Sequence, residues 1–387
     1  MILKANLQVI LEKQVIVMAK ALKDVYSKVF LVEFGRKIQS VYSAFNVSKF
    51  VDSLMDTTWN ALPLKARTRR ISTTLGSFLP NRYEDALDVL FRIADTCVGF
   101  PYLFFPDFIV VYGQKEKHWD LSMQALEYFT QKSSSEFAIR PFILNNPERV
   151  MQKMMEWAKH PDEHVRRLAS EGCRPRLPWG EALPMFKVDP NPVLAVLELL
   201  KADSSVYVRK SVANNLNDIS KDNPNSVLEI SKRWIGECPE TDWIIRRGCR
   251  TLIKEANHEA MELFGYAVFK DKTQLITASS LSLHPMEVTI GEKCDIQYSL
   301  NICKGDPVHV RIEYAIDFVK SNGKTSRKSF LLSDKTVAGG TYITGTRTHN
   351  WSDLTTRRHY PGAHRVTLLI NGLNVAESIL TLRPTNK

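Results

Sequence analysis

Basic side chains recur in a fixed phrase along the chain. The phrase reads DEHVRRLA at 162–169, DSSVYVRKSVA at 203–213 and DWIIRRGC at 242–249, and a looser form, SSEFAIRPFI, stands at 134–143. In the three full copies an acidic residue suited to a helix start is followed by an aliphatic residue and two basic ones. Guanidinium and ammonium groups neutralise phosphates and donate hydrogen bonds to their oxygens. The pattern therefore favours binding of a polyanion.

The aliphatic residue of each phrase marks a repeat. Val165, Val208 and Ile245 lie 43 and then 37 residues apart, close to the period of HEAT-type helical pairs. In such a solenoid the aliphatic residue packs inward, and the adjacent basic residues project along the concave surface. The predicted ladder consists of Arg140, Arg166, Arg167, Arg209, Lys210, Arg246 and Arg247. An arginine at this position is equally suited to form a salt bridge with the aspartate of a neighbouring repeat.

Carboxylates lie on the same predicted helices. Glu171 follows Val165 by six residues, as Asn214 follows Val208, and Asp218 lies one helical turn beyond Asn214. Adjacent repeats are therefore expected to bring these polar groups to one stretch of the groove. A carboxylate beside phosphates repels them, which disfavours pure binding and favours catalysis.

The spacing of apolar residues changes along the chain and divides it into two predicted domains. Apolar residues recur at three- and four-residue spacing up to about Phe269, for example at 148–160 and 191–203. After Thr277 apolar and polar residues alternate, and turn formers such as Asn322-Gly323 separate the segments. We predict a multidomain protein with an all-α HEAT-like repeat solenoid over 1–274 and an all-β domain over 281–387.

Composition limits the cellular compartment and the classes of partner that we expect. Lys plus Arg number 52 against 42 for Asp plus Glu, and the net charge of +10 favours an acidic partner. The six cysteines show no metal-finger or paired spacing, which is typical of a reduced intracellular protein. Charges interrupt the apolar N-terminus, and Pro101, Pro106 and Asp107 interrupt the most apolar stretch. We expect a monomeric cytoplasmic protein with no membrane partner, and nucleic acid is the first candidate for the acidic partner.

Metal and nucleophile chemistry are disfavoured. His160 and His164 have the spacing of metal ligands, but HPDEH is not HExxH and is typical of a proline-started helix with an acidic first turn. Serine, cysteine and histidine residues form no nucleophile motif, and no glycine-rich phosphate loop occurs. The prediction is no metal and no cofactor.

Three segments together resemble the AlkC branch of the AlkC/AlkD DNA glycosylases. They are SSEFAIRPFI, HPDEHVRRLASEGCRPRLPW at 160–179 and SVANNLNDISKDNP at 211–224, and LKARTRRISTTL at 64–75 is similar to the family's early basic helix. The resemblance implies a HEAT-like solenoid that grips duplex DNA and removes bases alkylated at ring nitrogens, 3-methyladenine foremost, without a metal. Some members of the branch carry an immunoglobulin-like C-terminal domain, so we expect the β domain to be an immunoglobulin-like sandwich.

The same resemblance implies the catalytic residues. Glu136, Glu171 and Asp218 stand at the matching family positions. A base methylated at N3 is already cationic, so its departure needs no acid, whereas the deoxyribose becomes oxocarbenium-like as the bond breaks. A carboxylate stabilises that charge and accepts a proton from the attacking water. Trp179, in an irregular connection, is expected to stack on the sugar or hold the cationic base, or else to pack between repeats.

Arg174 and Arg176 flank Pro175 and are predicted to contact phosphates. The alternative function is a non-catalytic helical-repeat adaptor that binds DNA or an acidic protein. A ladder of arginines serves both functions equally well. Only the carboxylates and Trp179 favour the glycosylase.

Overall fold

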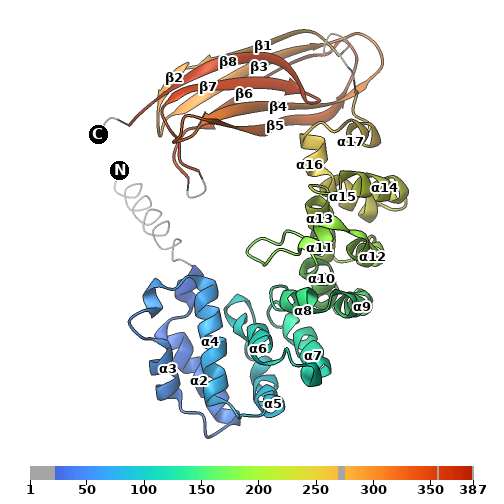
Figure 1. Cartoon of the computed structure of the whole chain (residues 1–387). Coiled ribbons are helices and arrows are strands. Elements are labelled where there is room, and N and C mark those ends of the chain that lie inside the picture. The colour runs from blue at the N-terminus through green and yellow to red at the C-terminus, as the bar shows by residue number, and fades with distance from the viewer. Residues whose placement is uncertain (1–21, 269–274, 355–356, 386–387) are drawn as a thin grey trace, which may run out of the picture. The chain divides into compact units, whose positions relative to one another are not determined.

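The computed structural model describes residues 22–268, 275–354 and 357–385. Helices form the first part of the chain and strands the second (Figure 1). The helices are η1 (Leu22–Val25), α2 (Lys28–Val41), α3 (Val47–Leu54), η2 (Trp59–Ala61), α4 (Leu64–Phe78), α5 (Tyr83–Ala94), η3 (Phe100–Tyr102), α6 (Phe104–Tyr112), η4 (Glu116–His118), α7 (Trp119–Thr130), α8 (Ile139–Asn145), α9 (Pro147–Trp157), α10 (Glu163–Gly172), α11 (Pro184–Val188), α12 (Asn191–Leu200), α13 (Val206–Ile219), α14 (Pro224–Trp234), α15 (Pro239–Gly248), α16 (Arg250–Lys254) and α17 (His258–Leu263). Within the described ranges, no helix has the length and apolarity needed to cross a membrane.

The repeated phrases form helices α10, α13 and α15, as predicted. Val165, Val208 and Ile245 are all fully buried, so the aliphatic position of each phrase does face the core. The side chains of Asp162 and Ser205 cap α10 and α13 by accepting hydrogen bonds from backbone N–H groups of the first turn. α10 packs on α13, and α9 packs on α8, α10 and α12. The helical part is thus a series of helices packed on their near neighbours in sequence.

Residue contacts divide the chain into two compact units. One unit runs to Asn223 and also includes Gly236–Ile244, and the other contains Pro224–Ile235 and everything from Ile245 onward. The change from helices to strands lies between α17 and β1. α14, α16 and α17 therefore belong to the same compact unit as the strands, although their apolar spacing in the sequence groups them with the preceding helices.

The strands form two sheets. They are β1 (Ile276–His284), β2 (Glu287–Thr289), β3 (Lys293–Ile302), β4 (Val308–Val319), β5 (Thr325–Val337), β6 (Tyr342–Asn350), β7 (Gly362–Ile370) and β8 (Leu373–Arg383). Among the described residues, one sheet has the order β1-β3-β6 and the other β2-β8-β7-β4-β5. All pairings are antiparallel except that of β2 with β8. The turn predicted at Asn322-Gly323 does join β4 to β5.

Apolar residues from both sheets share one core, which makes the domain a sandwich. Leu300 and Ile343 of the first sheet cluster with Ile312 and Leu368 of the second. A neighbouring cluster is built around the fully buried Trp351. The predicted all-β sandwich following a helical-repeat part is confirmed.

Asp334 of β5 joins the last helices to the sandwich within the second unit. Its carboxylate accepts hydrogen bonds from Tyr266 Oη (2.9 Å) and His309 Nε2 (2.9 Å). It also forms ion pairs with Arg246 of α15 (3.2 Å) and Arg311 of β4 (3.3 Å). Burial acts to raise the pKa of Asp334, but the hydrogen bonds and positive charges of these four neighbours outweigh it and hold the pKa below its usual value.

Asp334→Asn is expected to lower the free energy of unfolding at neutral pH by about 2 kcal/mol, because hydrogen bonds to a charged group are lost. A lowered pKa stabilises the fold above the unfolded value near 4, and that contribution disappears as the pH falls through the folded value. The deficit should therefore shrink in acid. Chemical unfolding at several pH values measures it, with the exposed Glu377→Gln as the control. A deficit that persists at low pH would contradict the charge-based explanation.

Candidate active site

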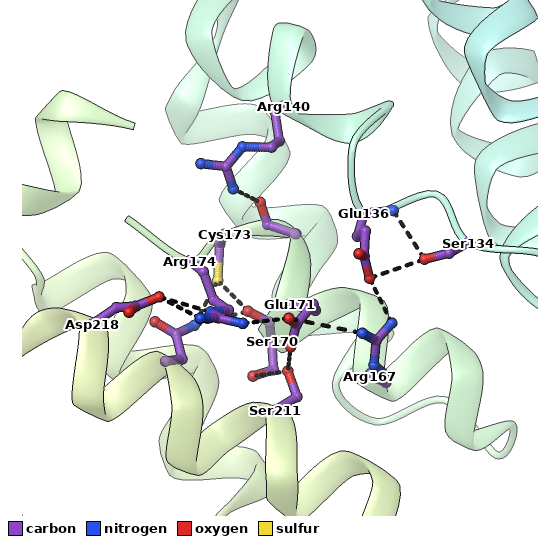
Figure 2. Close-up of polar contacts among 12 residues, drawn as sticks. Ser134, Glu136, Arg140, Arg167, Ser170, Glu171, Cys173, Arg174, Ser211 and Asp218 are labelled. Atoms are coloured by element: carbon purple, nitrogen blue, oxygen red, sulfur yellow. Dashed lines mark hydrogen bonds and ion pairs between the residues drawn. The ribbon is translucent and has the colours of Figure 1, made fainter. Parts of the chain in front are cut away.

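The three predicted carboxylates come from neighbouring elements of the first unit. Glu136 precedes α8, Glu171 lies in the last turn of α10, and Asp218 lies in the last turn of α13. Because α10 packs on α13, Glu171 and Asp218 approach the same guanidinium group (Figure 2). Only 5% of Glu171 and 3% of Asp218 are exposed. Carboxylates buried to this extent require opposite charges nearby.

Arg174 lies between these two carboxylates. Its Nε and Nη2 contact Oδ2 of Asp218 at 2.8 and 2.7 Å, and its Nη1 donates to Oε1 of Glu171 at 2.5 Å. Burial acts to lower the pKa of Arg174, but attraction to the two carboxylates and hydrogen bonds to them outweigh it and raise the pKa. Arg174, predicted to contact phosphates, is instead 6% exposed and engaged inside the protein.

Arg167 joins the third carboxylate to the group. Its Nη1 lies 2.7 Å from Oε2 of Glu136, and its Nη2 lies 3.8 Å from Oε1 of Glu171. Ser134 Oγ donates to the same Glu136 oxygen at 3.1 Å. The guanidinium of Arg167 also stacks 4.7 Å from the ring centre of Tyr207. This arginine, predicted as part of a surface ladder, therefore bridges two carboxylates.

The second carboxylate oxygens of Glu171 and Asp218 also have partners. Ser211 Oγ donates to Oε2 of Glu171 at 2.5 Å, and Lys221 Nζ lies 3.0 Å from Oδ1 of Asp218. Acids and bases thus alternate in a charged row made of Glu136, Arg167, Glu171, Arg174, Asp218 and Lys221. The row holds three negative and three positive groups, so their formal charges cancel.

Arg140 secures the connection that follows α10. It is fully buried, and its side chain donates to the backbone carbonyls of Gly172 and Glu181. Burial lowers its pKa to about 10. The prediction that Arg140 lines a groove is therefore corrected, because its guanidinium replaces water for two backbone carbonyls on either side of residues 173–180.

Trp179 lies in that connection and faces solvent. It is 64% exposed and has a φ of +63°, a left-handed conformation that non-glycine residues seldom adopt and that carries strain of roughly 1–3 kcal/mol. Lys65 of α4 donates to its carbonyl at 2.6 Å. With Lys65, Ser134 and Phe137, Trp179 lines a hollow of about 50 Å³. Its exposure fits contact with a ligand and not packing between repeats.

Arg166 and Arg209, two residues of the predicted ladder, are engaged by contacts within the protein. Nε and Nη2 of Arg166 bind Asp203 of the next repeat at 2.7 and 3.1 Å. Arg166 and Arg209 each also donate to the backbone carbonyls five and six positions earlier in the chain. The two repeats thus use the same structural contact, and the salt-bridge alternative holds for Arg166.

The other residues that were predicted to contact phosphates differ in their exposure and in their ion pairs. Arg176 forms a two-pronged ion pair with Asp222 at 2.8 and 2.6 Å. Arg246 belongs to the junction with β5 described above, in the second unit. Lys210 and Arg247 are exposed. The predicted ladder therefore does not form one continuous basic surface.

Sequence reasoning missed Tyr207 and Ser211. Tyr207 is 40% exposed in the first turn of α13, beside Arg167, and its pKa is raised chiefly by burial of its hydroxyl region. Both residues lie within the phrase at 203–213, which marked the helix. No spacing rule, however, identifies which of its side chains meets α10.

Comparison with known proteins identifies the family of the chain. A family model described as "DNA alkylation repair enzyme" matches residues 114–233, and one for the C-terminal Ig-like domain of the uncharacterised protein YhaZ matches residues 277–384. The uncharacterised protein YhaZ of Bacillus subtilis is 43% identical over 351 residues, 91% of this chain and 96% of that protein. The alkylpurine DNA glycosylase AlkC of Pseudomonas fluorescens, solved bound to DNA containing an abasic site analog, is 37% identical with a TM-score of 0.89, over 94% of this chain and 100% of that one. The chain belongs to the AlkC family of DNA alkylation repair enzymes.

The alkylation-repair match includes the whole charged row of this AlkC-family member. Residues 114–233 contain Glu136, Glu171 and Asp218 together with Trp179. The immunoglobulin-like match spans β1 to β8. The sequence resemblance to the AlkC branch and the expectation of an immunoglobulin-like domain are confirmed.

The contrast between Arg166 and Lys210 is testable by unfolding. Arg166→Gln is expected to lower the free energy of unfolding by about 2 kcal/mol, since Asp203 loses its charged donor. Lys210→Gln should stay within about 0.5 kcal/mol of the wild type, because the side chain is exposed. Denaturant titration of both variants measures the difference. Equal stabilities would contradict the inter-repeat role of Arg166.

Proposed function

We propose that this protein is a DNA glycosylase that excises cationic N3-alkylated bases, 3-methyladenine foremost, from duplex DNA. Membership of the AlkC family supports the enzyme class. The observation that carries the proposal is the charged row, in which the buried Glu171 and Asp218 and the half-buried Glu136 are paired with arginines, in a unit that also holds the exposed Trp179. The predictions of a monomer, a cytoplasmic location and no cofactor belong to the same proposal.

The proposed reaction is hydrolysis of the N-glycosidic bond. The base leaves with the electron pair of that bond, which neutralises its positive charge. Water attacks C1′ and passes a proton to a carboxylate, which releases it to solvent. As the bond breaks, the carboxylates Glu171 and Asp218 stabilise the positive charge that develops on the sugar.

Trp179 is suited to contact the lesion or its sugar. An aromatic face attracts a cation within about 6 Å of the ring centre. The residue lies in a connection tied to α4 through Lys65 and to the end of α10 through Arg140. These hydrogen bonds fix the backbone of the connection, and the aromatic ring of Trp179 remains exposed. A wide apolar pocket is not needed for the proposed reaction.

The alternative function, a non-catalytic adaptor, explains the charged row less well. A binding protein has no use for carboxylates that repel phosphate and require buried arginines to keep them ionised. An adaptor would also gain nothing from the strained backbone at Trp179. The experiments below separate the two functions by base release.

Lesion charge tests the mechanism directly. Purified protein is expected to release 3-methyladenine from methylated duplex DNA and to leave hypoxanthine in place, because no general acid is available in the proposed mechanism to help a neutral base depart. Chromatography of free bases after single-turnover incubation provides the measurement. Comparable release of both bases would show that the mechanism is wrong, and tight binding without release would support the adaptor.

Removing one carboxylate charge tests the assigned residues. Glu171→Gln and Asp218→Asn are each expected to slow single-turnover excision by about 10²–10³-fold, the scale for one preorganised electrostatic group. DNA affinity should stay equal or rise slightly, since a repulsive charge is removed. Thermal unfolding must first show that each variant is folded, because both residues are ion-paired. Near wild-type rates for both folded variants would refute the assignment.

A further inference from the structure

Two ionised carboxylates that share a buried site present a physical problem. Like charges close together in a low-dielectric interior favour protonation of one of them. Glu171 and Asp218 are both almost fully buried and both contact Arg174. A cation placed between them removes the repulsion and allows both to remain charged.

We propose that Arg174 is a positioning residue that keeps Glu171 and Asp218 ionised and sets their relative orientation. This role rests on the glycosylase function proposed above. The guanidinium is planar, and its donors point in fixed directions along its edges. One edge, with Nε and Nη2, is taken by Asp218, and Nη1 is taken by Glu171. The orientation of each carboxylate is thereby tied to that of the other.

The surroundings of Arg174 exclude a phosphate contact in this arrangement. All three of its nitrogens bind carboxylate oxygens, and only 8% of its side chain is exposed. Arg176, two residues later, shows the contrast, because it is exposed and pairs with Asp222 at the surface. The two arginines that flank Pro175 thus differ in their roles although their sequence context is the same.

Other charged groups face the pair from each packed element. Arg167 of α10 contacts Glu171, and Lys221, just after α13, contacts Asp218. Arg140 of α8 acts electrostatically on the site, and burial raises the pKa of the Cys173 thiol to about 12, so that it stays neutral. Among these groups, Arg174 alone forms ion pairs with both Glu171 and Asp218 in the described residues.

Arg174→Lys tests the bridging geometry while it retains the charge. A lysine ammonium is a single point of charge on a flexible stem and lacks the fixed donor directions by which the guanidinium orients both carboxylates. The variant is expected to be folded, to bind abasic-site duplex DNA within about twofold of the wild type, and to excise 3-methyladenine about 10²-fold more slowly under single-turnover conditions. Arg149→Lys, at a surface arginine paired with Glu116 and stacked on Trp119, is the matched control and should excise at the wild-type rate.

Arg174→Gln tests the electrostatic part through the pH dependence of excision. Without the cation, one carboxylate is expected to take up a proton, so the rate deficit should be largest in acid and should shrink as the pH rises. A protein that only lost stability would show no such dependence once folded. If the glutamine variant does not fold, the lysine variant decides.

The outcomes separate this inference from the function on which it rests. No base release by the wild-type protein overturns both. Wild-type excision together with an unchanged rate for folded Arg174→Lys overturns the positioning role alone. A lysine variant that loses DNA affinity but not its rate at saturation would instead make Arg174 a phosphate contact.

Discussion

Packing of α10 against α13 leaves little of Glu171 and Asp218 exposed to water. A carboxylate in such a place stays ionised only if cations and hydrogen-bond donors replace its hydration shell. Arg174 and Lys221 provide the cations, and Ser211 provides a further donor. The arrangement of the neighbouring arginines follows from this requirement, because the buried acids draw inward side chains that would otherwise lie in solvent.

The same requirement links the site to the stability of the helical part. Arg167 and Arg174 bind groups on more than one element, and Arg140 binds backbone carbonyls at both ends of the connection that holds Trp179. The charged groups are therefore part of the contacts that hold the helices together. A site supported in this way needs little rearrangement to present its carboxylates, which is the condition under which electrostatic stabilisation of a transition state is most effective.

Much of the fold could be predicted from local pattern. Helix and strand periodicity depends on residues a few positions apart, so the burial of Val165, Val208 and Ile245 followed from their place in each phrase. The turn at Asn322-Gly323 followed from the conformational freedom of glycine, which has a φ of +76° there. The membership of α14 and the last helices in the unit with the strands was not visible, because it depends on contacts between distant segments such as Arg246 with Asp334.

For the site, the resemblance in sequence to the AlkC branch selected Glu136, Glu171 and Asp218 as candidates, since such a resemblance transfers positions, and the irregular connection around Trp179 drew attention to that residue. The sequence did not predict in which direction the basic side chains point. An arginine has several rotatable bonds and reaches either solvent or a neighbouring element from the same backbone position. The partner of Arg174 lies 44 residues away at Asp218, and that of Arg166 lies 37 residues away at Asp203. Only the packing of helices distant in sequence decided that these arginines bind carboxylates inside the protein.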